Sequence, residues 1–230
     1  MSMPFPTVQS LAGPVSFFLG VLAIAFIFAM DFMTNDLNSL SFVRDKLPIA
    51  ESELGRNHDR LVVISVILVV SGSLAAITFL TWLYRTYADA RALRPRALRR
   101  GPWSAVVPWL VPVVNLVLPF VAMRALWLAS DPDFDPEDPR PPRVTVWFWL
   151  WWLSWIVGSV LALLAFVPVI SGTPTAAQLI TRDHWAMAAC AAGIVAAILA
   201  ISTVQVERGR LTLLEDRLRN PDWRGWTKRR

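Results

Sequence analysis

The sequence has few of the side chains on which catalysis and metal binding depend. It contains one cysteine and two histidines in 230 residues. A single cysteine excludes an intramolecular disulfide, and we expect Cys190, which lies in an apolar run, to be a small buried residue. His58 has no second ligand at metal-binding spacing. We therefore expect no enzyme: the sequence offers no catalytic residue, no cofactor and no metal site.

Charged side chains are also absent from long stretches of the chain. Hydrophobic residues make up 55% of it and include 12 tryptophans, which exceeds what a soluble domain of this size carries. A helix needs about 20 apolar residues to cross a bilayer. The sequence therefore predicts an all-α integral membrane protein. We expect a single membrane domain over residues 1–206, with four transmembrane helices at about 14–33, 61–84, 144–170 and 185–206.

The first apolar run begins at Pro14, where the start of a helix tolerates proline. A cleaved signal peptide is the alternative, but it would need a basic residue before the run, and Met1 to Gly13 has none. We expect an uncleaved first span. The mixed-charge interval from Thr34 to Arg60 then predicts a short extramembrane loop.

The second apolar run ends in a strongly basic loop. Asp89 is the one acid there, among the arginines Arg85, Arg91, Arg94, Arg96, Arg99 and Arg100. By the positive-inside rule this loop is cytoplasmic. Basic residues beside apolar runs favour anionic lipid headgroups over nucleic acid as partners.

The next segment is uncharged from Gly101 to Met123, yet prolines interrupt it at Pro108, Pro112 and Pro119. Each proline removes a backbone N–H, so a lipid-exposed helix would leave carbonyls unpaired. We expect a proline-broken re-entrant or interfacial segment over residues 101–127. The Asn115 side chain would hydrogen-bond the freed backbone groups, and Arg124 and Trp127 would return the chain to the headgroups.

Counting spans supports this interpretation. A fifth span would put the basic loop and the basic C-terminus on opposite sides of the membrane, whereas four spans put both termini in the cytoplasm. The linker Asp131 to Arg143 is then also cytoplasmic. Its alternating acids could suggest a divalent cation site, but the glycine turn and bidentate Glu of a calcium loop are missing. We interpret it as a solvated linker stiffened by proline.

The last two apolar runs carry packing and interfacial signals. Trp147, Trp151 and Trp155 share one helical face, which favours an aromatic belt at the interface over a cofactor platform. Small residues predict close helix packing on the last run: Ala188, Ala189, Ala192, Gly193, Ala196, Ala197 and Ala200.

Residues 207–230 predict a cytoplasmic amphipathic tail. Leu211, Leu214 and Leu218 fall on one helical face. The tail ends with residues suited to an anionic leaflet: Trp223, Trp226, Lys228, Arg229 and Arg230.

The central stretch resembles a known bacterial family. Its FLTWLYR, ADARAL and PVVNLVLPFVAMRALW segments are similar to the family called domain of unknown function 4328. Asp89 stands where we expect Asn, and Leu118 where a basic residue is usual. The resemblance implies a multi-span protein of the bacterial inner membrane and implies no activity.

Two classes of function remain open. The first is a membrane scaffold or interaction protein with a protein partner or a second copy of the chain, and we favour it. The second is a small-solute transporter or channel component that uses the broken segment around Asn115, although no span carries a central charged residue. The residues expected to form a structural or functional core are Trp82, Arg85, Pro112, Asn115, Pro119, Arg124 and Trp127.

Overall fold

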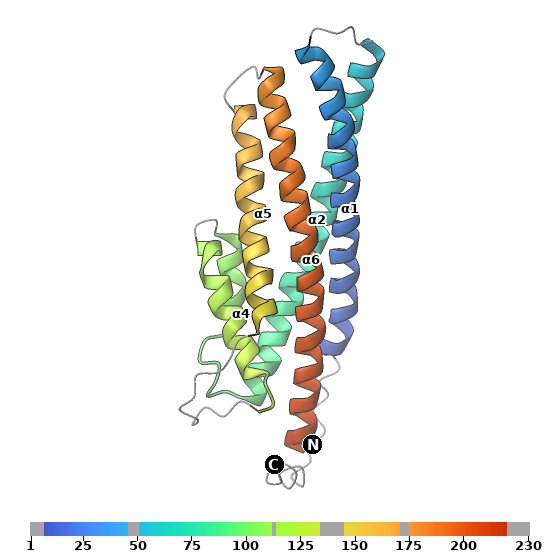
Figure 1. The fold of residues 1–230 in the computed structure, drawn as a ribbon. Coiled ribbons are helices and arrows are strands. Elements are labelled where there is room, and N and C mark those ends of the chain that lie inside the picture. The colour runs from blue at the N-terminus through green and yellow to red at the C-terminus, as the bar shows by residue number, and fades with distance from the viewer. Residues whose placement is uncertain (1–6, 46–50, 112–113, 134–144, 171–174, 220–230) are drawn as a thin grey trace. The chain divides into compact units, whose positions relative to one another are not determined.

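The computed structural model describes residues 7–45, 51–111, 114–133, 145–170 and 175–219, and helices are the regular elements in these ranges. Figure 1 shows the long helices and, drawn in green, the shorter ones that follow α2. In chain order the elements are α1 (Thr7–Arg44), α2 (Glu51–Leu93), α3 (Trp103–Val106), the 3-10 helices η1 (Val107–Leu110) and η2 (Val114–Leu116), α4 (Leu118–Ala129), α5 (Val146–Ile170) and α6 (Ala176–Arg219).

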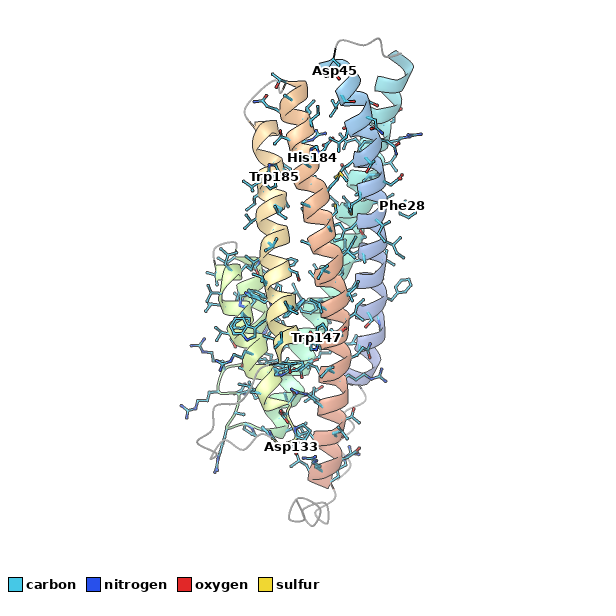
Figure 2. All side chains as sticks on the ribbon, in the orientation of Figure 1. Phe28, Asp45, Asp133, Trp147, His184 and Trp185 are labelled. Carbon is cyan, nitrogen blue, oxygen red and sulfur yellow. The ribbon has the colours of Figure 1, made fainter. Side chains whose placement is uncertain are left out.

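Four of the described helices, α1, α2, α5 and α6, are long and apolar enough to cross a membrane. Their large apolar side chains face outward: only 11% of the most apolar window of α2 is buried. Phe28 on α1 is 63% exposed and points away from its helix (Figure 2). Such exposure suits lipid, so the predicted fold class, an all-α membrane protein with four spanning helices, is confirmed.

The helices extend beyond the predicted spans. Most of the described part of the predicted loop 34–60 is helical, because α1 continues to Arg44 and α2 begins at Glu51. Residues 34–44 contain no proline or glycine to end a helix. At 38, 43 and 44 residues, α1, α2 and α6 are each about twice the length that crosses a bilayer. Hydropathy predicted the membrane crossings and missed the polar helix ends.

The start of α6 also differs from expectation. The fourth span was predicted to begin at about residue 185, but α6 already begins at Ala176. Thr175 and Gln178 form a capping box: the Thr175 amide donates to Gln178 Oε1 over 2.8 Å, and the Gln178 amide donates to Thr175 Oγ1 over 3.4 Å. This pair satisfies backbone donors that a helix start leaves open. Residues 171–174 lie outside the described part of the chain.

The chain forms two compact units. Unit 1 comprises residues 1–16, 77–148 and 201–230, and unit 2 comprises residues 17–76 and 149–200. Each of the four long helices contributes to both units. By contrast, every described residue of the proline-broken segment 101–127 belongs to unit 1.

Unit 2 is built on close approaches between helices at small residues. An added Cβ on Gly158 of α5 would lie 3.5 Å from the Ala192 Cβ of α6. Gly193 also lies on α6, and an added Cβ there would lie only 2.7 Å from Cε2 of Phe26, a residue of α1. The Phe26 ring thus packs directly against the backbone of α6 at Gly193. The predicted close packing of the small residues of α6 is confirmed at Ala192 and Gly193.

The predicted tail is not a separate element, since α6 runs without interruption to Arg219. Leu211 and Leu214 are buried within unit 1, and Leu218 is 55% exposed. Most of the apolar face predicted for the tail therefore packs against protein. Residues 220–230, with Trp223 and Trp226, lie outside the described residues.

Candidate functional site at the end of α4

The C-terminal end of α4 is bound by an arginine that follows α2. A helix leaves its last carbonyls without intrahelical donors. Arg94 Nη1 donates to the carbonyl oxygens of Ala129 over 3.4 Å and Asp131 over 2.7 Å, and its Nη2 donates to that of Pro132 over 3.3 Å. Hydrogen bonds from a charged donor contribute about 1.5–3 kcal/mol each when well formed. Arg94 thus joins the end of α2 to the end of α4.

Two arginines of α6 hold the same turn. Arg210 Nη1 donates to the Trp127 carbonyl over 3.0 Å, and its guanidinium carbon lies 4.0 Å from the centroid of the Trp127 ring. Arg210 also pairs with Asp131 at 3.8 Å. Arg217 pairs with Asp133 at 2.6 Å, and Figure 2 labels this acid. We call Arg94, Arg210 and Arg217 the arginine clamp.

A buried acid lies beside the clamp. Glu207 is one helical turn before Arg210 and is 0% exposed, and neither of its carboxyl oxygens has a hydrogen-bond partner among the described residues. Arg210 and Asp131 are the charged groups that act on it. The Ser130 hydroxyl is within reach but already donates to the Trp127 carbonyl over 3.1 Å. Burying a carboxyl group without a partner costs several kcal/mol of folding free energy. The buried Glu207 therefore lowers the stability of unit 1.

Sequence reasoning missed Glu207 and the role of Arg210. A signal was available, because Glu207, Leu211 and Leu214 are spaced as one face of a helix. An acid aligned with two buried leucines is itself a candidate for burial. Instead, the acid was assigned to an exposed tail because it directly follows the last apolar run.

The predicted core residues on α2 divide into a buried and an exposed one. Trp82 is fully buried, its indole N–H has no partner among the described residues, and its ring lies 5.6 Å from that of Phe79. Phe79 in turn lies 5.3 Å from Trp109 of η1. These rings join α2 to the proline-broken segment. Arg85 is exposed.

The predicted residues on α4 also divide. Pro119 and Trp127 are buried and Arg124 is exposed. The Trp127 ring lies 5.7 Å from the ring of Phe148 at the start of α5. Trp127 therefore joins α4 to α5 on one side and to Arg210 on the other.

The middle of the broken segment is described only in part, since Pro112 lies outside the described residues. The backbone N–H of Asn115 donates to the Val111 carbonyl over 2.8 Å. Its side-chain Oδ1 is buried and accepts no hydrogen bond from the described residues. The role predicted for this side chain, as a partner of the freed backbone groups, stays a prediction.

The acidic linker shows structural contacts where it is described. The Asp133 amide donates to Asp131 Oδ1 over 3.0 Å, and both acids pair with clamp arginines. Within the described ranges, no group of three or more His, Cys, Asp or Glu could hold a metal ion. Asp135 and Glu137 lie outside those ranges.

The sequence model of the family described as Domain of unknown function (DUF4328) matches residues 45–207. The match includes α2, the broken segment, α5 and Glu207, and it excludes Arg210 and Arg217. No curated protein and no solved structure matches the chain. Because the match covers more than half of the sequence, the chain belongs to the DUF4328 family.

Proposed function

We propose that this DUF4328 protein is a membrane scaffold or interaction protein whose unit 1 presents a preformed polar surface to a protein partner. The arginine clamp is the observation that carries this proposal. It joins the end of α2, the end of α4 and the last turns of α6, which are far apart in the sequence. A surface fixed in this way loses little conformational entropy when a partner binds.

The proposal includes an orientation. The arginine bias after α2 favours the cytoplasmic side for this end of unit 1, and hence cytoplasmic termini in the inner membrane of a bacterium. It also includes a re-entrant or interfacial course for residues 101–127. This course is supported by the short helices α3, η1 and η2, none of which is long enough to cross a bilayer.

Crosslinking in membranes tests the proposal. A photo-crosslinking amino acid in place of Arg124, which is exposed on α4, should give a discrete protein adduct in the full-length chain. The clamp variant Arg94→Gln should lose the adduct, because it frees the end of α4. Arg60→Gln is the matched control, since it removes an exposed charge from unit 2. The absence of a protein adduct when the clamp is intact would contradict the proposal. An adduct that persists in the Arg94→Gln variant would contradict it too.

A small-solute transporter or channel component is the second candidate. Its support is the Asn115 Oδ1, a buried acceptor without a donor among the described residues in a segment of broken helices. Solute flux in proteoliposomes separates the two functions. Flux that Asn115→Leu abolishes, in a variant whose melting temperature is unchanged, would favour transport over interaction.

A further inference from the structure

A second arginine cluster lies outside the clamp, in the last turn of α2 and in the turn that follows it. Arg91, Arg96, Arg99 and Arg100 are all exposed, and we call them the basic turn. Leu98 in their midst is only 1% exposed. The turn is closed by backbone hydrogen bonds from Arg94 to Ala90 and from Ala97 to Arg94. A buried leucine therefore holds the turn in place while its arginines face outward.

The chain then returns along the side of α2. A Cβ on Gly101 would lie 3.7 Å from Arg91 Nη1, and the rings of Tyr84 and Trp103 lie 4.9 Å apart. Tyr84 and Arg91 are seven residues apart, so they lie on one face of α2. The Arg91 guanidinium therefore lies beside Gly101, the residue that follows Arg99 and Arg100.

These guanidinium groups have no counter-charge within the described residues. None of the four makes an ion pair there, and the charged groups that act on Asp89, the one acid of the loop, are Arg85 and Glu215. Like charges held together in this way repel one another, and a bound anion relieves the repulsion. Guanidinium groups match phosphate oxygens with paired hydrogen bonds, so phosphate is the favoured anion.

The surroundings indicate a lipid as the source of that phosphate. Directly after the turn, α3 and η1 expose large apolar side chains: Trp103 is 63% exposed, Val107 50% and Leu110 68%. Tryptophan is enriched where headgroups meet hydrocarbon. We infer that the basic turn binds the phosphate group of an anionic phospholipid, with Trp103 against the acyl chains. This site is independent of the protein partner proposed above.

Lipid binding to the purified full-length protein, measured by native mass spectrometry, tests the inference. Phosphatidylglycerol is the anionic probe and phosphatidylcholine the zwitterionic one. Each basic residue near an anionic surface contributes about a fivefold factor, so Arg99→Gln with Arg100→Gln should weaken phosphatidylglycerol binding roughly 25-fold. Arg60→Gln with Arg208→Gln removes the same charge elsewhere and should leave binding unchanged.

Three outcomes would overturn the inference. Equal binding of the two lipids, which carry the same phosphate and differ in the net charge of the headgroup, would show that the turn does not select an anionic lipid. Equal losses in both double variants would show a diffuse charge effect. Full competition by inorganic phosphate would identify a site for free anions. Arg91→Lys provides a second variant that keeps the charge and removes the planar fork. It should weaken phosphatidylglycerol binding with the melting temperature unchanged, and unchanged binding would exclude paired hydrogen bonds from Arg91.

Discussion

Replacing Gly193 by alanine should destabilise unit 2, although alanine is the better helix former. The added Cβ would lie 2.7, 3.0 and 3.1 Å from three carbons of the Phe26 ring. Carbon atoms in contact prefer about 3.5–4.0 Å. Because three ring atoms face the glycine, rotation of the ring alone does not relieve the overlap. The helices must separate or the ring must leave its position.

The expected size follows from two opposing terms. Overpacking of this kind costs about 1–3 kcal/mol, and replacing glycine by alanine within a helix returns up to about 1 kcal/mol. Gly193→Ala should therefore lower the free energy of unfolding by up to about 2 kcal/mol, and its stability should lie about 1–3 kcal/mol below that of a glycine-to-alanine variant that shares the helix gain and lacks the overlap. Gly20→Ala is the matched control, since an added Cβ there meets nothing within 4 Å. It should be neutral or stabilising by up to about 1 kcal/mol.

Thermal unfolding of detergent-purified protein measures the difference. Gly193→Ala should melt below the wild type and Gly20→Ala at or above it. Adding Phe26→Leu to Gly193→Ala should recover part of the loss, because the smaller side chain makes room for the methyl group. If Gly193→Ala and Gly20→Ala melt at the same temperature, Phe26 does not pack on Gly193 and the described contact is wrong.

Three further substitutions test other features. The Asp183 side chain is 2% exposed and lies 2.7 Å from Arg182. Arg182→Gln removes this partner and should therefore cost about 3–5 kcal/mol of stability. A loss below about 1 kcal/mol in chemical unfolding would count against a structural ion pair. Glu207→Gln should keep or raise the melting temperature, since a neutral amide costs less to bury than an unpartnered carboxylate; a large drop would reveal a partner for the acid. Asn115→Leu should lower the melting temperature by the equivalent of about 1–3 kcal/mol if its side chain pairs with backbone groups, and unchanged melting would remove that role.

The sequence was sufficient for features that depend on composition along the chain. Uncharged apolar runs predicted the four spanning helices, and the spacing of small residues predicted the close approach at Gly193. The prolines predicted that residues 101–127 do not form one helix, and α3, η1, η2 and α4 confirm it. Each of these features is governed by local physical rules.

The arginine clamp depends instead on which residues meet in space. Arg210 and the Trp127 carbonyl are 83 positions apart, and nothing in the local pattern around either residue indicates the other. A count of arginines near apolar runs predicts a side of the membrane, and it treats Arg94, which binds three carbonyls, like the exposed Arg96. The helix ends were missed for a related reason. A change from apolar to polar sequence marks the end of an apolar run, but α1, α2 and α6 continue as helices through the polar residues.

Cysteine accessibility tests the topology most directly. Cys190→Ala removes the one native cysteine. In that background, Asp45→Cys places a single exposed thiol between α1 and α2, and Asp133→Cys places one just after α4. Both positions are labelled in Figure 2. With four spans and a segment 101–127 that does not cross, a membrane-impermeant maleimide should label Asp45→Cys in intact cells. It should label Asp133→Cys only after the cells are permeabilised. Labelling of Asp133→Cys in intact cells would mean that the segment crosses the membrane, and it would contradict the account.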